Sequence, residues 1–235
     1  MDRLGIISPL LPEAACLGTR PRKGAVYSAG AGISVCVCGM GADRAASAAE
    51  ELALSGMELL ISWGTAGALT TGLEAGDLVI PEEIVDDAGH ALKTDPTIRG
   101  QLLHRLDDCP ANIYLGRIYQ AAQVVRGSAE KIGLHERYKA IAVDMESAAI
   151  GAVAARRGLP FLVIRSIVDT LSAPVPQAVL DCTDSFGTVR ILALLKALGA
   201  HPGEIPGLLR LVTAFRRSAQ TLRWIGSRKE RLLKV

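Results

Sequence analysis

Aromatic residues, charge of one sign and long hydrophobic runs are all scarce in this chain. Aromatics make up 4% of its 235 residues, which disfavours the stacking platforms of proteins that bind single-stranded nucleic acid. The formal net charge of +2 is too small to indicate a polyanionic partner for the whole chain. No apolar run approaches the ~18 residues of a membrane span, and the first residues lack the basic and apolar regions of a signal peptide. We therefore expect a cytoplasmic protein that binds no nucleic acid.

Cysteine and histidine are also few, and their spacing gives no sign of a metal site. Cys36 and Cys38 would share one face of a strand, but no second pair completes a zinc site. We predict no metal, no cofactor and mostly buried free thiols. The histidines are predicted to be surface residues. The positions concerned are Cys16, Cys36, Cys38, Cys109 and Cys182, and His90, His104, His135 and His201.

Apolar residues, in contrast, make up 49% of the chain, enough for one large core. The most informative stretch is 140–169. Residues 140–143 and 161–167 are short apolar runs without alternation, which is typical of parallel strands covered on both faces. Between them, the Ala-rich segment 146–156 predicts a helix that Gly158 ends. This stretch therefore predicts a βαβ unit.

Charged residues mark the ends of these elements. Asp144 and Glu146 follow the first strand and Asp169 follows the second, where ligands bind in open α/β sheets. Arg165 lies inside the apolar second strand, where an unpaired charge would be costly. Structural alternatives remain open: Asp144 could cap the helix, and Glu146 could lie in the first helical turn only because the helix dipole favours an acid there. Asp169 and Arg165 could form an ion pair.

The rest of the chain predicts further strands and helices of an α/β fold. The turn Gly39-Met40-Gly41 joins a strand to a helix, and its backbone N–H groups could hold an anion. A Pro-containing loop at 170–176 is placed to cover the site. The expected strands are 4–7, 57–62, 76–80, 112–118 and the hairpin 24–28 with 33–38; the expected helices are 45–55, 95–106, one from Ser128, 184–198 and 205–225.

Two motifs resemble one known family. The run VDMESAAIGAVAARRGLPFLVIRSIVD resembles the V-E-M-E-A-A-A…P-F-x-x-x-R-x-x-x-D signature of the nucleoside phosphorylase / methylthioadenosine–adenosylhomocysteine nucleosidase superfamily, with Asp144 in place of the first Glu. The expected loop 63–69 resembles the family's G-[ST]-A-G-[GA]-L segment, which precedes a G-D-[LIV]-V-I strand. The resemblance covers nearly all of residues 1–198. It implies a three-layer α/β/α sandwich with a mixed twisted sheet over residues 1–202, and a homodimer.

The resemblance also implies roles for individual residues. Asp169 would protonate N7 of a leaving purine, and Glu13 with Arg165 would orient or deprotonate the attacking water. Counting along the chain without a gap from the strand Gly5-Ile6-Ile7 places Glu13 at the position of the family's catalytic Glu. The alternative is that Glu13 is a solvated acid at a helix start. Glu146 would hold the ribose hydroxyls. The other substrate-binding residues implied are Met145, Thr65, Ala66, Gly67 and Val124.

Two positions depart from the family's patterns. Hexameric bacterial phosphorylases carry R-V-G-S, whose Arg binds phosphate, where this chain has residues 62–65 with the sequence S-W-G-T. A phosphate nucleophile needs fixed positive charge, whereas water does not. We therefore favour hydrolysis, with phosphorolysis as the alternative. Gln123 stands where nucleosidases place an aromatic residue against the base, so only a backbone contact at Val124 carries over.

The last 33 residues, 203–235, contain eight Lys or Arg against two Glu, with apolar residues at helical spacing. This pattern predicts a separate basic amphipathic tail, which could pack on the domain or lie on the anionic inner face of a membrane. The tail resembles the end of the hopanoid-associated members of the superfamily. That resemblance implies a lipid-linked purine nucleoside substrate, adenosylhopane, from which adenine is removed. Open alternatives are a purine nucleoside phosphorylase, a soluble methylthioadenosine/adenosylhomocysteine or futalosine nucleosidase, and a nucleoside-binding scaffold.

Overall fold

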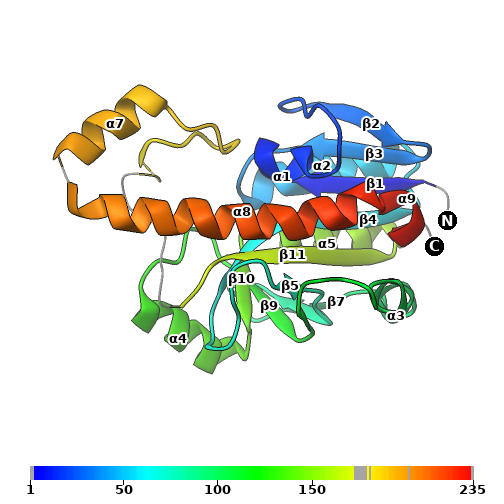
Figure 1. Ribbon diagram of the computed structural model, residues 1–235. Helices are drawn as coiled ribbons and strands as arrows, with labels where there is room; N and C mark the ends of the chain where they lie inside the picture. The colour runs from blue at the N-terminus through cyan, green and yellow to red at the C-terminus, as the bar shows by residue number, and fades with distance from the viewer. Residues whose placement is uncertain (1–2, 172–178, 180, 201, 234–235) are drawn as a thin grey trace.

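The protein is a three-layer α/β/α sandwich built around one mixed sheet, as the sequence predicts (Figure 1). The computed structural model describes residues 3–171, 179, 181–200 and 202–233. Eleven strands in these residues form the sheet. They are β1 (Leu4–Ser8), β2 (Val26–Gly30), β3 (Ile33–Val37), β4 (Leu59–Ala68), β5 (Leu78–Val79), β6 (Glu83–Val85), β7 (Ala91–Lys93), β8 (Ile113–Tyr114), β9 (Arg117–Gln120), β10 (Ala142–Asp144) and β11 (Phe161–Asp169).

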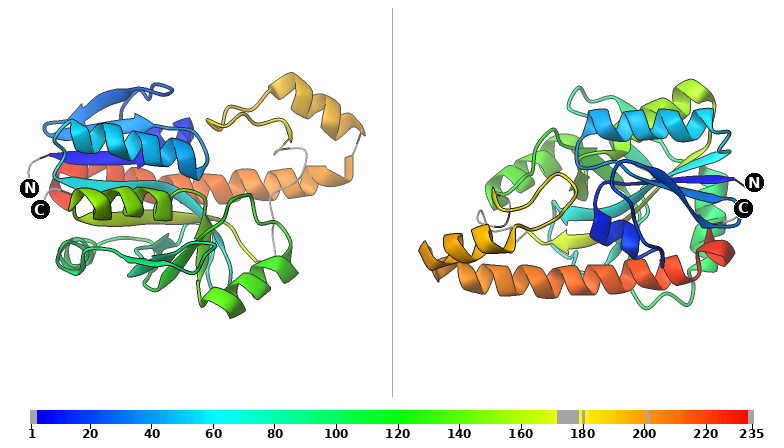
Figure 2. Two further views of the ribbon diagram at one scale, coloured as in Figure 1. Left: turned by 180° about the vertical axis from the view of Figure 1, so that it is seen from behind. Right: turned by 90° about the horizontal axis from the view of Figure 1, so that it is seen from above.

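Helices cover both faces of this sheet (Figure 2). The described helices are α1 (Leu11–Ala15), α2 (Ala42–Leu54), α3 (Pro96–Arg105), α4 (Ser128–Tyr138), α5 (Ser147–Arg157), α7 (Ile191–Ala200), α8 (Ile205–Ser227) and α9 (Lys229–Leu232), with a 3-10 turn η1 (Pro202–Glu204). The βαβ unit predicted from the sequence is β10, α5 and β11. Gly158 ends α5 in a left-handed conformation, φ 64°, which glycine adopts without strain.

Strand β4 is the centre of the sheet. It runs parallel to β1 on one side and to β11 on the other, and its last residues pair antiparallel with β10. The predicted loop at residues 63–69 is therefore wrong. Thr65 pairs with Ser166 of β11 and Gly67 with Val143 of β10, so hydrogen bonding between strands continues β4 through Ala68.

Two other predicted elements, the strand 112–118 and the helix 184–198, have different bounds in the structure. The strand predicted at 112–118 is two strands, β8 and β9, because Gly116 (φ 134°) breaks it. The helix predicted at 184–198 begins only at Ile191. The carboxylate of Asp184 instead organises a turn by accepting bonds from the N–H groups of Phe186 (2.9 Å) and Thr188 (2.8 Å). Most of the loop predicted at 170–176 lies outside the described residues.

Each face of the sheet carries its own apolar core. Helices α2 and α5 cover one face, while α1, α3, α9 and the second half of α8 cover the other. Leu222 and Ile225 of α8 are almost fully buried there, and burying such a side chain stabilises the fold by roughly 1.5–3 kcal/mol. This half of the tail therefore shares a core with the sheet. The division into units 1–202 and 203–235 stays a prediction.

The first half of α8 and the preceding α7 project beyond the sheet (Figure 1). Ile205, Leu209 and Val212 are 42%, 62% and 39% exposed, and their i, i+4, i+7 spacing places them on one face of α8. Ile191 of α7 is 68% exposed. None of the helices in the described part of the chain is both long and apolar enough to span a membrane.

Candidate active site

A pocket lies at the carboxyl ends of β1, β4, β10 and β11, where the topology of α/β sheets favours ligand binding. Of the nine predicted site residues, only Arg165 is absent from its lining. The described lining residues are Pro9, Leu10, Glu13, Met40, Thr65, Ala66, Gly67, Gln123, Val124, Val125, Val143, Asp144, Met145, Glu146, Val168 and Asp169. Residues from six separate parts of the sequence thus meet in one cavity.

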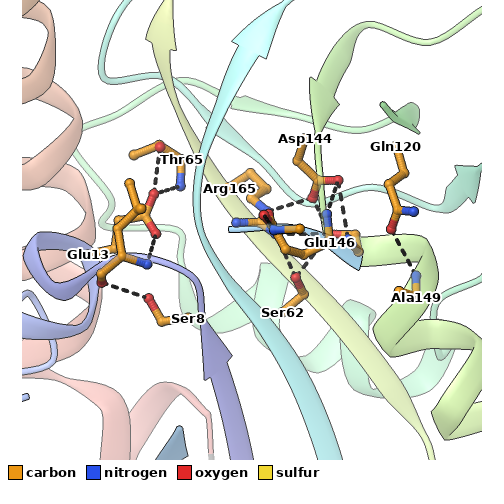
Figure 3. Close-up of polar contacts among 12 residues, drawn as sticks. Ser8, Glu13, Ser62, Thr65, Gln120, Asp144, Glu146, Ala149 and Arg165 are labelled. Carbon is orange, nitrogen blue, oxygen red and sulfur yellow. Dashed lines mark hydrogen bonds and ion pairs between the residues drawn. The ribbon is translucent and has the colours of Figure 1, made fainter. Parts of the chain in front are cut away.

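Glu13 is held in α1, which follows directly from β1. Its Oε1 accepts hydrogen bonds from the backbone N–H of Thr65 (2.8 Å) and from the Thr65 hydroxyl (2.6 Å), and its Oε2 accepts from the N–H of Leu10 (3.2 Å). The side chain of Glu13 is almost completely buried, so the alternative of a solvated acid at a helix start is wrong. Figure 3 shows the carboxylate of Glu13 directed toward Thr65.

Arg165 is fully buried beside the pocket residues Asp144 and Glu146, and it forms ion pairs with both. Its Nε is 2.8 Å from Asp144 Oδ2, and its Nη2 is 3.5 Å from Glu146 Oε2. Nη2 also donates to the hydroxyls of Ser62 (2.8 Å) and Ser147 (3.3 Å). Figure 3 shows Asp144, Glu146 and Ser62 converging on the guanidinium group. Sequence reasoning missed both serines, because nothing in their local sequence distinguishes them.

Asp144 has two functions in this network. Besides pairing with Arg165, its Oδ1 accepts from the N–H groups of Glu146 (3.4 Å) and Ser147 (3.3 Å) at the start of α5, and its Oδ2 accepts from the Ser147 hydroxyl. The helix-capping interpretation is therefore consistent with the structure. Asp144 also lines the pocket, so it contributes both to the fold and to the charge of the site.

The glycine turn predicted to hold an anion holds a carboxylate of the chain itself. The N–H of Gly41, at the start of α2, donates to Glu146 Oε1 at 3.0 Å. Burial raises the pKa of Glu146 to about 7, even though Arg165 and Gly41 favour its charged form. Burial also raises the pKa of Glu13, against the opposing effect of Arg165. Both carboxyl groups can therefore exchange protons closer to neutral pH than ordinary glutamates.

Asp169 forms its ion pair with Lys131 and not with Arg165. The predicted Asp169–Arg165 ion pair is wrong, because Arg165 is turned toward Asp144 and Glu146. The partner of Asp169 is Lys131 of α4, with Nζ 2.6 Å from Oδ2. Burial raises the pKa of Asp169 and the charge of Lys131 opposes that rise. No sequence pattern indicated Lys131, since a single lysine in a helix normally lies in solvent.

Two glycines of β4 make room for the charged groups. A Cβ atom at Gly67 would lie 2.5 Å from Asp169 Oδ1, and one at Gly64 would lie 2.5 Å from Arg165 Nη1 and 2.7 Å from Glu13 Oε2. These distances are too short for any other residue without displacing the carboxyl or guanidinium groups. The small residues of the G-T-A-G segment therefore permit the close approach of side chains to β4.

The remaining residue predictions concern groups away from the pocket. All five cysteines are free thiols; Cys16, Cys36, Cys38 and Cys182 are buried and Cys109 is half-buried, so the prediction of mostly buried thiols is confirmed. His90 and His104 are exposed, and His135 is half-buried with Nδ1 2.8 Å from the Ala140 carbonyl. His201 lies outside the described residues. Within the described ranges, no three His, Cys, Asp or Glu side chains are grouped to hold a metal ion.

The chain is similar to enzymes that act on purine nucleosides. It is 28% identical to the guanosine phosphorylase of Halorubrum lacusprofundi over 139 residues, which cover 55% of this chain and 58% of that protein. It is 26% identical to the 5′-methylthioadenosine/S-adenosylhomocysteine nucleosidase of Staphylococcus epidermidis over 129 residues, 48% of this chain and 57% of that one. The chain thus spans less than two thirds of the length of these two relatives.

A solved structure and a family model extend the comparison. The structure of the 5′-methylthioadenosine/S-adenosylhomocysteine nucleosidase from Neisseria meningitidis, in complex with methylthio-immucillin-A, has a TM-score of 0.68 at 20% identity. The match covers 97% of this chain and all of that one, which shows a shared fold. The family model of the Phosphorylase superfamily matches residues 13–191, which is more than half of the chain. The protein therefore belongs to the phosphorylase superfamily.

Proposed function

We propose that this protein cleaves the N-glycosidic bond of a 5′-substituted adenine nucleoside with water and releases adenine. The observation that supports this most strongly is the convergence of Glu13, Glu146 and Asp169, from α1, the β10–α5 junction and β11, on one pocket. The purine nucleoside enzymes among the relatives support the same class of reaction. No metal or redox cofactor enters the proposal.

The proposed reaction assigns one step to each carboxyl group. Asp169, protonated, donates its proton to N7 while the bond between N9 and C1′ breaks, so that the purine leaves uncharged. The sugar becomes a cation resembling an oxocarbenium ion, which the carboxylate of Glu146 stabilises while it holds the ribose hydroxyls. Glu13 accepts a proton from the water whose oxygen bonds to C1′. The products are adenine and the free 5′-substituted ribose.

The charge around Glu13 favours water over phosphate as the nucleophile. None of the described residues that line the pocket is a lysine or arginine, whereas four are acidic. The charge of Arg165 is opposed by Asp144 and Glu146, both within 3.5 Å of its nitrogens. Arg165 Nη1 has no protein hydrogen-bond partner in the described part of the chain. A neutral water between Nη1 and Glu13 suits this environment, and a phosphate dianion would meet net negative charge.

Phosphorolysis is the second candidate, because one relative is a guanosine phosphorylase. We expect the rate of adenine release from a panel of 5′-substituted adenosines to be the same with and without inorganic phosphate, and the sugar product to be the free 5′-substituted ribose. Adenine is followed by absorbance and the sugar by a reducing-end assay, with a known phosphorylase as the phosphate-dependent control. A rate that rises in proportion to phosphate, with the 5′-substituted ribose 1-phosphate as product, would contradict hydrolysis. Tight binding without adenine release would instead support a nucleoside-binding scaffold.

We further propose that the substrate carries a large apolar 5′ substituent, as adenosylhopane does, and that the protein docks on anionic lipid to reach it. The projecting half of α8 supports this proposal, because its exposed residues Ile205, Leu209 and Val212 are accompanied by exposed Arg210 and Arg216. Insertion of the apolar side chains into the membrane would favour binding, and each basic residue near the membrane surface would add about 1 kcal/mol. A cytoplasmic location and a homodimer stay predictions.

We expect the protein to sediment with phosphatidylglycerol vesicles at low salt and to lose most of that binding in Leu209→Glu, which places a charge in the apolar contact. The matched control is Leu54→Glu on α2, since Leu54 is 71% exposed but lies away from α8; its binding should be unchanged. Adenine release from a water-soluble substrate should be the same in both variants. Equal vesicle binding by the two variants, or none by the natural protein, would contradict lipid docking through α8.

A further inference from the structure

Lys131 is the one fully buried lysine in the described part of the chain, and the proposed reaction so far gives it no role. Its side chain is 0% exposed, which is unusual because lysine is almost never fully buried unless it is paired. Its Nζ donates to Asp169 Oδ2 at 2.6 Å and to the Thr170 carbonyl at 3.2 Å. Lys131 therefore places its positive charge at the end of β11, although its helix, α4, contributes no residue to the described lining of the pocket.

The first turn of α4 holds the chain just beyond Asp169 in the same way. The hydroxyl of Ser128 donates to the Leu171 carbonyl at 2.8 Å. Ser128 and Lys131 are three residues apart, so they lie on one face of α4. Together they bind three consecutive residues, 169–171, through one side chain and two carbonyl groups. This arrangement restricts where the Asp169 carboxyl group can lie.

The two oxygens of that carboxyl group have different surroundings. Oδ2 accepts a hydrogen bond from Lys131, whereas Oδ1 lies against the pocket wall, where it is the first atom that a Cβ added at Gly67 would meet. We propose that Lys131 is a positioning residue for Asp169: it binds Oδ2, leaves Oδ1 for the purine, and sets the pH range over which Asp169 keeps its proton. This inference rests on the proposed function, in which Asp169 is the proton donor.

The charges around Asp169 support this assignment. Burial raises the pKa of Asp169 and the Lys131 ammonium lowers it, so removing the ammonium should raise it further. Gly67 on the β4 side is uncharged. The nearby acids of the pocket, Asp144 and Glu146, are paired with Arg165. On α4 itself, Glu130 accepts from the N–H of Arg126, and the other charged residues, Glu136 and Arg137, are exposed.

Lys131→Met tests the proposal, because methionine is similar in length and stays compatible with burial. Only protonated Asp169 can donate a proton, so the rate should fall as the pH rises through its pKa. In Lys131→Met the alkaline limb of kcat/KM should therefore move to higher pH, by about 1–3 units, and kcat at the optimum should fall because Asp169 is less well placed. Lys131→Arg, which keeps the charge, should leave the limb near its natural position. An alkaline limb at the same pH in Lys131→Met and the natural protein would overturn the proposal.

Three further variants separate this role from a merely structural one. Lys131→Gln provides a second neutral substitution, with the same expected shift, should the methionine variant fold poorly. Lys93→Met on β7 is the matched control, since Lys93 is exposed, and it should change neither the limb nor kcat. Combined with Asp169→Asn, Lys131→Met should cause no additional loss of kcat, because Lys131 acts through Asp169; an additional loss would overturn the proposal. Full activity in Asp169→Asn alone would instead refute the proposed function.

Discussion

Asp169→Asn is expected to reduce kcat for adenine release by about 10²–10⁴-fold, the usual contribution of a general acid. Asparagine keeps the shape of the side chain and can still accept the hydrogen bond from Lys131, but it has no acidic proton for N7. The alkaline limb of the pH–rate profile should disappear as well, because the residue no longer titrates. Steady-state kinetics across the pH range would measure both effects, and urea unfolding would verify that the variant is folded.

The control for this substitution is Asp108→Asn. Asp108 is an exposed aspartate in a surface ion pair with Arg231, and such pairs contribute little. Its substitution should leave both kcat and the pH profile unchanged. If Asp169→Asn were as active as the Asp108 variant, Asp169 would not be the proton donor. The convergence of acids on the pocket would then need another explanation.

Arg165→Met is expected to lower the free energy of unfolding by about 3–5 kcal/mol, the usual result of removing one partner from a buried ion pair. The substitution leaves Asp144 and Glu146 buried without their cation. The charge of Arg165 lowers the pKa of Glu146, so its removal should raise that pKa above the present value of about 7. The loss of stability should therefore be larger at pH 8, above the present pKa of Glu146, than at pH 5, where Glu146 is protonated.

Urea unfolding at the two pH values measures this difference. The matched control is Arg156→Met on α5, because Arg156 forms an exposed ion pair with Glu50; it should cost less than about 1 kcal/mol and show little dependence on pH. Adding Asp144→Asn to Arg165→Met should recover part of the loss by removing one unpaired charge. A loss that is equal at pH 5 and pH 8 would mean that lost packing, rather than unpaired charge, determines the effect.

Most of the fold could be predicted from local sequence. Apolar runs without alternation indicated buried strands, and the Ala-rich segment ending at Gly158 indicated the helix of the βαβ unit. The error at the carboxyl end of β4 had a non-local cause. The G-T-A-G segment was expected to be a loop because it resembles the family's G-[ST]-A-G-[GA]-L segment, but it belongs to β4 and its backbone bonds to two neighbouring strands. Those partner strands, β10 and β11, are distant in the sequence, so no local pattern could predict the pairing.

Local sequence predicted which residue types are available and roughly where they lie: acids at the ends of apolar strands, glycines near them, and Arg165 within a strand. It did not predict how these charges pair, which follows from the three-dimensional packing. The tertiary structure joined Arg165 to Asp144 and Glu146 and brought Lys131 to Asp169. The physical reason is that a buried charge must find an opposite charge in space, and the partner in space is set by how strands and helices pack, not by distance along the chain.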